Sequence, residues 1–315
     1  MLALALGALA AMLSFASHSQ AWARGMAGDF SFPWRAARIL LDGHDPYVVI
    51  QPSGPPPFDD HFRYPLPAAV VSLPFAPLRP PLAGALFVGL GVACFAFAIT
   101  RDGYGRLPLA MSAPVFWATQ NVQWAPLLTA AALLPSLSWL WVVKPNIGAA
   151  LWWYRPSRRA LAWQLGGGLL LVGVSFLFVP TWPAGWLAAV RSGALASQYV
   201  PPVLVPGGAL ALLALLRWRR PEARLLAAMA CVPQNYFLYD QLPLALVART
   251  WRGALAYTAL SYLALAWWLH YGKDPALASV PAGSAALAPV VIALFYLPAL
   301  AMVLRRPNVD PADGS

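Results

Sequence analysis

Apolar residues fill long continuous stretches of this chain, and short polar segments separate them. After an apolar start at 1–22 and a polar segment at 23–64, the apolar segments are 65–79, 81–100, 107–120, 124–143, 147–154, 160–180, 201–216, 225–247, 254–271 and 284–304. A helix needs about 20 apolar residues to cross the hydrocarbon core of a membrane. The pattern predicts an all-α polytopic membrane protein, a bundle of about 8–10 transmembrane or re-entrant helices with a long first extracytoplasmic loop.

Several of these segments are too short to cross a membrane alone, and prolines interrupt many of them. The interrupting residues are Pro65, Pro67, Pro74, Pro114, Pro126, Pro145 and Pro233. Proline removes a helical hydrogen bond, and non-helical backbone at membrane depth is tolerated only where protein buries it or where it lines a wet cavity. Broken helices that converge at one depth indicate a binding or catalytic site.

We expect a single integral membrane domain over 1–315. Its parts are a first transmembrane helix at 1–22, an extracytoplasmic loop at 23–64, a helical bundle at 65–304 and a polar tail at 305–315. A signal peptide is the alternative for 1–22, but no basic residue precedes the apolar run and Ser17–Gln20 is a poor cleavage site. The true start of this helix can lie a few residues upstream.

The amino-acid composition excludes the class of soluble proteins. Of the 315 residues, 60% are hydrophobic and 10% are charged, and the mean hydropathy is +0.62. Soluble domains carry about 25% charged residues. The composition therefore excludes a soluble enzyme and a disordered chain.

The basic excess, 21 Lys and Arg against 11 Asp and Glu, lies mostly in short clusters between apolar segments. The clusters are Arg101/Arg106, Arg155/Arg158/Arg159, Arg217/Arg219/Arg220/Arg224, Arg249/Arg252 and Arg305/Arg306. Such clusters are typical of cytoplasmic loops, and attraction to anionic lipid head groups accompanies them. The charge therefore indicates topology rather than nucleic-acid binding, and it places 23–64 on the outer face of the plasma (inner) membrane.

An amphipathic helix is predicted in the first outer loop. Its apolar face consists of Phe30, Trp34, Ala37 and Leu41, and its polar face of Arg35, Arg38 and Asp42. Pro33 suits the first turn of this helix, and Gly43 suits its C-terminal cap. We expect the apolar face to lie in the membrane interface.

Two acidic residues flank this helix, and each has two interpretations. Asp29 is either a carboxylate favoured by the dipole at the helix start or a functional group at the outer membrane surface. Asp45 is either part of a turn, since Asp45-Pro46 is ordinary turn chemistry, or a second functional carboxylate. Local spacing alone does not decide between them.

In this region the chain resembles family 87 glycosyltransferases, which are GT-C-fold membrane mannosyltransferases that use a polyprenyl-phosphate sugar. The residues that carry the resemblance are Gly28-Asp29-Phe30, Trp34-Arg35-Ala36-Ala37, Gly43-His44-Asp45-Pro46-Tyr47, Arg63-Tyr64-Pro65-Leu66, Pro74 and Phe75-Ala76-Pro77. Later landmarks are Asn121/Gln123, Val143-Lys144-Pro145-Asn146, Pro233-Gln234 and Tyr239-Asp240. The resemblance covers about residues 25–250, and the segment around Pro233 lacks a histidine that the family often carries.

The resemblance implies a catalytic carboxylate at Asp29, with Asp45 as the second candidate. Inverting sugar transfer requires a base for the acceptor hydroxyl and cationic groups or donors for the departing phosphate. Lys144 is a candidate phosphate ligand because short apolar segments flank it, as expected of a re-entrant tip, although it can also snorkel to the interface. The further candidates for substrate binding are His44, Arg63, Tyr64, Gln123 and Asp240. For Gln123, hydrogen bonding between helices is the alternative.

The expected function is transfer of a hexose, mannose by the resemblance, from a polyprenyl-phosphate donor to a lipid or glycan acceptor on the extracytoplasmic face. No metal-ligand set and no nucleotide-binding glycine loop is visible, so we expect no cofactor. A lipid or solute transporter is the main alternative, since broken helices and an intramembrane lysine suit it too. A non-enzymatic membrane scaffold is the third.

Overall fold

The computed structural model describes residues 1–19, 27–52, 60–192 and 199–309. The α-helices are α1 (Leu2–Ser19), α2 (Ser31–Leu41), α3 (Pro46–Val49), α4 (Leu66–Ser72), α5 (Pro80–Thr100), α6 (Ala113–Asn121), α7 (Ala125–Ala131), α8 (Pro145–Trp152), α9 (Arg158–Phe178), α10 (Trp182–Arg191), α11 (Pro221–Cys231), α12 (Trp251–Tyr271), α13 (Val280–Val291) and α14 (Leu297–Leu304). Parts of the predicted outer loop (23–26 and 53–59) and of the predicted tail (310–315) lie outside the described residues.

Tighter helical turns connect many of these helices. The 3₁₀ segments are η2 (Leu73–Phe75), η3 (Tyr104–Met111), η4 (Pro135–Val143), η6 (Pro202–Leu204), η7 (Gly208–Arg217), η8 (Leu238–Val247) and η9 (Pro275–Leu277), and η10 (Ile292–Tyr296) is a π-helical segment. Over the described ranges the chain is all-helical, apart from two isolated β-bridges. The predicted all-α class is confirmed.

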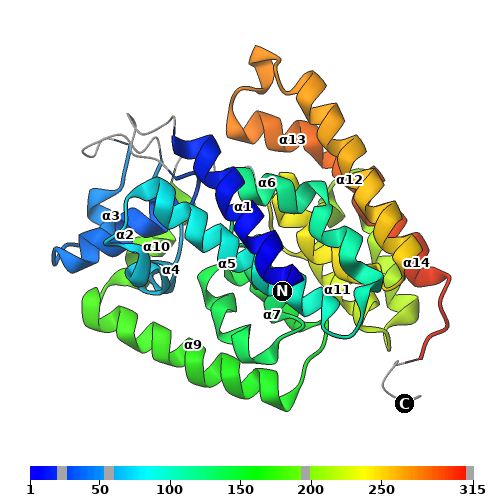
Figure 1. The fold of residues 1–315 in the computed structure, drawn as a ribbon, viewed down its shortest axis with the longest axis horizontal. Coiled ribbons are helices and arrows are strands. Elements are labelled where there is room, and N and C mark those ends of the chain that lie inside the picture. The colour runs from blue at the N-terminus through cyan, green and yellow to red at the C-terminus, as the bar shows by residue number, and fades with distance from the viewer. Residues whose placement is uncertain (20–26, 53–59, 193–198, 310–315) are drawn as a thin grey trace.

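Within the described ranges, four helices are long and apolar enough to cross a membrane. They are α1, α5, α9 and the continuous run Val280–Leu304, which comprises α13, η10 and α14. In an apolar 18-residue stretch of α5, 67% of the residues are buried inside the protein. In the corresponding stretch of α9, only 11% are buried. Helix α5 is therefore central, whereas α9 runs along one edge of the molecule (Figure 1). The fold is that expected of a helical membrane protein.

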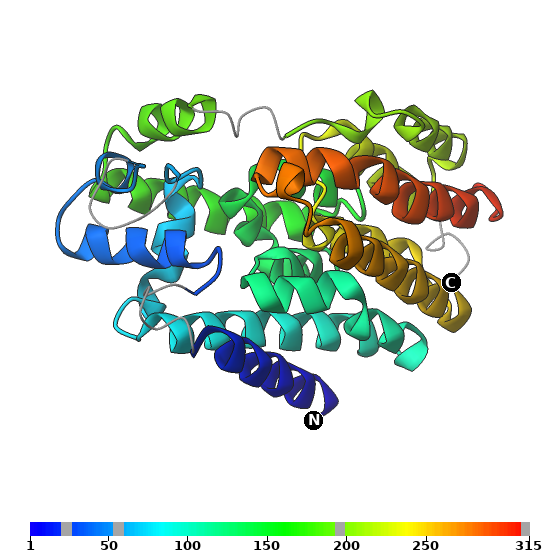
Figure 2. The ribbon, with the colours of Figure 1, turned by 90° about the horizontal axis from the view of Figure 1, so that it is seen from above.

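Small residues let α1 and α5 lie side by side, as Figure 2 shows. A Cβ atom added to Gly7 would lie 2.6 Å from the carbonyl oxygen of Gly89, and one added to Gly89 would lie 2.9 Å from Cβ of Ala11. Close backbone approach through glycine and alanine is the common way for membrane helices to associate, because lipid tails supply no hydrophobic drive.

Helix α2 is the predicted amphipathic helix, but its apolar face packs inside the protein. Phe30 stacks on Phe87 of α5 at 4.0 Å between ring centroids, and Trp34 Nε1 donates to the carbonyl oxygen of Phe75 at 3.1 Å. The prediction that this face lies in the membrane interface is therefore wrong, because α4 and α5 supply a protein surface for it. Leu41 is the exception and is exposed.

Several predicted membrane segments are divided into shorter elements. The segment 107–120 becomes η3 and α6, 124–143 becomes α7 and η4, and 225–247 becomes α11 and η8. Prolines stand at or near these divisions, as the sequence indicated. Irregular backbone occurs at 232–237, where one of these segments is divided. It also occurs at 122–124 and at Lys144, between neighbouring helical elements, and these breaks bring polar side chains into the interior.

Candidate functional site

Four polar residues from four separate parts of the chain meet in the interior. Gln123 Nε2 donates to Asp29 Oδ2, and Lys144 Nζ donates to Asp240 Oδ1 at 2.5 Å. The charges of Lys144 and Asp240 both act on Asp29, so the two pairs form one cluster. Asp29 precedes α2, Gln123 follows α6, Lys144 joins η4 to α8, and Asp240 lies in η8. We call Asp29, Gln123, Lys144 and Asp240 the interior cluster.

Left-handed backbone holds Asp29 and Gln123 together. Gly28, directly before Asp29, has φ of +56°, and Val122, directly before Gln123, has φ of +51°. The Asp29 amide donates to the carbonyl oxygen of Asn121 at 2.9 Å. A β-branched residue such as Val122 rarely adopts positive φ, and such strain costs roughly 1–3 kcal/mol, so the surrounding packing must impose it.

Close packing leaves no room for a side chain at Gly28. A Cβ atom there would lie 2.6 Å from the carbonyl oxygen of Asn121 and 3.1 Å from a methyl group of Val122. Only glycine satisfies both the positive φ and this contact. Gly28 therefore sets the position of Asp29.

Burial makes Asp29 a stronger base than an ordinary carboxylate. Asp29 lies outside the candidate membrane-spanning helices, and its side chain is half-buried. Burial raises its pKa from 3.8 to about 6; the Lys144 cation lowers it, the Asp240 charge raises it, and the Gln123 hydrogen bond lowers it. At neutral pH Asp29 is mostly ionised, yet it takes up a proton more readily than an exposed aspartate does.

Lys144 neutralises a carboxylate that is almost fully buried. The Lys144 side chain is 14% exposed and that of Asp240 is 1% exposed. Lys144 Nζ also lies 5.5 Å from the ring centroid of Tyr239, in cation–π range. The lysine ammonium is thus held at the edge of the cluster with part of its surface accessible.

Several acceptor oxygens in and beside the cluster lack a hydrogen-bond partner among the described residues. They are Gln123 Oε1, Asp240 Oδ2 and Gln241 Oε1. Buried polar atoms are satisfied in more than about 90% of cases, so each exception calls for an explanation. Three buried, unpaired acceptor oxygens therefore lie in or beside the cluster that contains the partly accessible Lys144 cation.

Tyr64 lies beside this cluster, whereas Arg63 is bound elsewhere. Tyr64 is within electrostatic range of both Asp29 and Asp240. Arg63 pairs with Asp60 at 2.8 Å, and its Nη2 donates to the carbonyl oxygen of Ser192, at the end of α10, at 2.8 Å. Arg63 therefore anchors the loop to α10.

Asp45 and His44 lie at the far end of α2 from Asp29. Helix α2 has 11 residues, which corresponds to roughly 16 Å at about 1.5 Å per residue. Asp45 caps α3, since its Oδ1 accepts from the Tyr47 amide at 2.8 Å, and His44 is exposed. The structure thus assigns Asp45 to the turn that its sequence suggested and does not bring it to the interior cluster.

Sequence reasoning missed two features of this site. Val122 gave no sign of its positive φ, because nothing in its side chain favours that conformation. Gln241 was not singled out, although a glutamine inside an apolar segment is a signal worth following. The side-chain nitrogen of Gln241 donates to Gln234 Oε1 at 3.2 Å. The backbone carbonyl oxygen of Gln241 accepts from the Tyr257 hydroxyl at 3.0 Å.

Comparisons with known proteins found no relative of this chain. No family model matches it, and no curated protein or solved structure shows significant similarity to it.

Proposed function

We propose that this chain is a membrane hexosyltransferase of GT-C type that uses a polyprenyl-phosphate sugar as donor. The sugar is a hexose, mannose by the resemblance, and the acceptor is a hydroxyl group of a lipid or glycan. The observation that carries the proposal is the position of Asp29, a carboxylate of raised pKa, beside Lys144 and Asp240. A base and a phosphate-binding cation in one site are the two groups that this reaction needs.

The proposed reaction is a single displacement at the anomeric carbon. Asp29 accepts the proton of the acceptor hydroxyl while that oxygen forms a bond to the anomeric carbon. The bond between this carbon and the phosphate oxygen breaks, and the polyprenyl phosphate leaves with the bonding electron pair. The configuration at the anomeric carbon is inverted.

The other residues of the interior cluster hold and stabilise the reactants in this proposal. Lys144 stabilises the negative charge that develops on the departing phosphate. Asp240 holds the lysine side chain in place through their 2.5 Å contact. The unpaired oxygens of Gln123 and Asp240 accept hydrogen bonds from sugar or acceptor hydroxyls.

We place this site at the extracytoplasmic face of the plasma membrane. The first outer loop contributes Asp29, and the basic clusters that predict cytoplasmic loops are at other positions in the chain. A lipid-linked donor reaches such a site from within the outer leaflet. This arrangement needs neither a nucleotide nor a water-soluble donor.

The test compares wild-type protein with Asp29→Asn in nanodiscs. Radiolabelled polyprenyl-phosphate mannose and a mixed lipid acceptor extract are supplied, and the product is followed by chromatography. The amide is isosteric with the carboxylate but is a far weaker base, so turnover should fall at least ~100-fold while donor binding persists. Asp42→Asn, an exposed aspartate just after α2, is the matched control and should retain full turnover.

Equal turnover in wild type and Asp29→Asn would overturn the assignment of the base. The transporter hypothesis predicts another result, because a buried Lys–Asp pair also suits transport. In that case no product forms with wild type, and liposomes that contain the protein move the labelled lipid between leaflets.

A further inference from the structure

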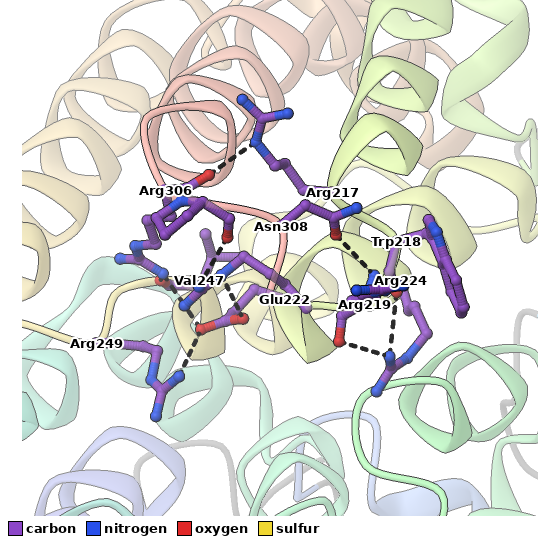
Figure 3. Close-up of polar contacts among 11 residues, drawn as sticks. Arg217, Trp218, Arg219, Glu222, Arg224, Val247, Arg249, Arg306 and Asn308 are labelled. Atoms are coloured by element: carbon purple, nitrogen blue, oxygen red, sulfur yellow. Dashed lines mark hydrogen bonds and ion pairs between the residues drawn. The ribbon is translucent and has the colours of Figure 1, made fainter. Parts of the chain in front are cut away.

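A buried glutamate with three arginines lies at the start of α11. Glu222 is fully buried, and its side chain lies 3.6 Å from Arg220, 3.3 Å from Arg249 and 3.2 Å from Arg306. Figure 3 shows the guanidinium groups of Arg249 and Arg306 approaching this carboxylate from different parts of the chain. We call Arg220, Glu222, Arg249 and Arg306 the arginine cluster.

The same region joins the end of the chain to the bundle. Arg217 Nε donates to the carbonyl oxygen of Arg306 at 2.7 Å, and Arg220 Nη1 donates to that of Pro307 at 3.2 Å. The Arg219 amide donates to Asn308 Oδ1 at 3.0 Å (Figure 3). Backbone carbonyl oxygens therefore help to hold the Arg217 and Arg220 side chains in place.

Positive charge exceeds negative charge in this cluster. Glu222 supplies one negative charge against three guanidinium groups, and it is the acid that all three contact within the described part of the chain. Burial lowers the pKa of Arg306; Glu222 raises it, and the charges of Arg220, Arg249 and Arg106 lower it further. Half-buried like charges repel one another strongly, so the site is electrostatically incomplete without a second anion.

Hydrogen-bonding capacity in the cluster is also incomplete. Arg220 Nε and Glu222 Oε2 are buried and lie 3.6 Å from each other, which is beyond hydrogen-bond distance. The Arg249 side chain is 28% exposed, so a ligand can reach it. Arginine binds phosphate through parallel N–H donors, so a phosphate group is one anion that suits this cluster.

The cluster lies where a membrane surface is expected. Arg306 follows the last candidate membrane-spanning run, which ends at Leu304. Trp218 is exposed nearby, and the Arg219 guanidinium lies 5.9 Å from its ring centroid. Tryptophan and arginine at the end of a membrane helix mark the depth of lipid head groups.

We propose that the arginine cluster binds a phosphate group, presented by the head group of an anionic phospholipid. Glu222 organises the three guanidinium groups, and the phosphate supplies the negative charge that they lack. The accessible side is that of Arg249, toward which the head group approaches. This proposal is independent of the proposed transferase activity and concerns a different part of the fold.

Lipid binding to the purified full chain in detergent tests the proposal. Native mass spectrometry and thermal unfolding are measured with phosphatidylglycerol, with phosphatidylcholine and with inorganic phosphate. Wild type should retain phosphatidylglycerol over phosphatidylcholine and gain thermal stability from it. Arg249→Gln should bind it roughly tenfold more weakly, the effect of one charge-assisted contact. Arg252→Gln, an exposed arginine three residues further along, is the control and should bind as wild type does.

Two further arms separate the outcomes. Glu222→Gln removes the competing carboxylate, so phosphatidylglycerol should bind more tightly to it than to wild type, provided that the variant folds. A stabilising effect of inorganic phosphate that Arg249→Gln loses supports the phosphate site and identifies a soluble ion as its ligand. The proposal is overturned if wild type, Arg249→Gln and Arg252→Gln bind phosphatidylglycerol equally and none responds to phosphate.

Discussion

At the scale of single residues, the charge state of Asp29 links its environment to its proposed role. Its carboxylate accepts a hydrogen bond from Gln123 and lies close to both Lys144 and Asp240. Burial opposes its charge, whereas the lysine and the glutamine favour it. A carboxylate in such a balance titrates near neutral pH and can both accept and release a proton.

This charge state predicts a pH dependence of rate. Asp29 acts as a base only when deprotonated, so turnover should rise with pH through a midpoint of about 6. Initial rates measured in nanodiscs from pH 4.5 to 8 test this rise. A midpoint near 4, the value for an ordinary aspartate, would show that the ionisation of a group other than Asp29 controls the rate.

The same shift predicts a pH-dependent effect on stability. The folded protein holds the Asp29 proton more tightly than the unfolded chain does, because the pKa rises from 3.8 to about 6. Stability therefore falls as pH rises through this window, by roughly 2–3 kcal/mol above pH 6. Asp29→Asn removes this penalty, so its Tm should exceed that of wild type at pH 7.5 and match it at pH 4. A lower Tm at pH 7.5 would contradict the burial argument.

Lys144 has two separable roles, which a double variant can distinguish. Lys144→Met leaves the nearly fully buried Asp240 carboxylate without its cation, and breaking such a pair costs about 3–5 kcal/mol. Adding Asp240→Asn removes the unpaired charge and should restore much of the stability. Donor affinity should remain roughly ten- to hundredfold below wild type, because the phosphate contact is still absent. Donor titration in nanodiscs that gave wild-type affinity for the double variant would limit Lys144 to neutralising Asp240.

At the scale of elements, the breaks between helices position the functional groups. Gln123 follows the end of α6, and Lys144 stands between η4 and α8. The prolines that begin α7 and α8 make these breaks obligatory, since proline cannot continue the preceding helical hydrogen bonds. Helix α2 contributes differently, because its buried face fixes the chain that carries Asp29.

Two glycines test how the loop before α2 positions Asp29. Gly28 and Gly43 both have positive φ, but an added Cβ atom meets the Asn121 carbonyl at 2.6 Å only at Gly28 and nothing within 4 Å at Gly43. Gly28→Ala should therefore displace Asp29 and abolish turnover. Gly43→Ala should cost only about 1–2 kcal/mol, the price of left-handed backbone, and keep turnover. Turnover and Tm are measured for both variants. Equal losses of turnover in the two would show that the close contact at Gly28 is not what positions Asp29 for catalysis.

At the scale of the whole molecule, orientation in the membrane decides whether the proposed site is accessible to its donor. Four candidate spans and the distribution of basic clusters predict that the first outer loop faces the extracytoplasmic side. The interior cluster and the arginine cluster depend on widely separated parts of the chain. The proposed transferase needs the interior cluster near the extracytoplasmic surface, and the proposed lipid binding needs the arginine cluster near a membrane surface.

Cysteine labelling tests this orientation in intact cells. The two native cysteines, Cys94 and Cys231, are free, and Cys231 is exposed, so both are first replaced by serine. Cysteines placed at Asp45 and Asp60 should react with an impermeant reagent from outside. Cysteines at Arg158 and Arg219 should react only after the cells are opened. Reversed labelling would overturn the extracytoplasmic placement of the site.

Local patterns in the sequence predicted much of the helical framework. The apolar segments at 81–100 and 160–180 correspond to α5 and α9, because an apolar run without internal proline can satisfy its backbone hydrogen bonds within one helix. The amphipathic helix before Gly43 was predictable for the same reason, since its spacing and its terminal glycine are local. The sequence also marked Lys144 and Asp240 as charged residues within or beside apolar segments, and it marked Asp29 by its place just before the amphipathic helix.

Tertiary structure alone decided which of these residues meet. Asp29 and Gln123 are 94 residues apart, and Lys144 and Asp240 are 96 apart. No periodicity encodes such pairs, because they arise from how broken helices pack. Packing also turned the apolar face of α2 toward α5 instead of the membrane, imposed positive φ on Val122, and gathered three arginines around Glu222. Sequence determined the class of the molecule through composition and local spacing, whereas long-range packing determined its sites.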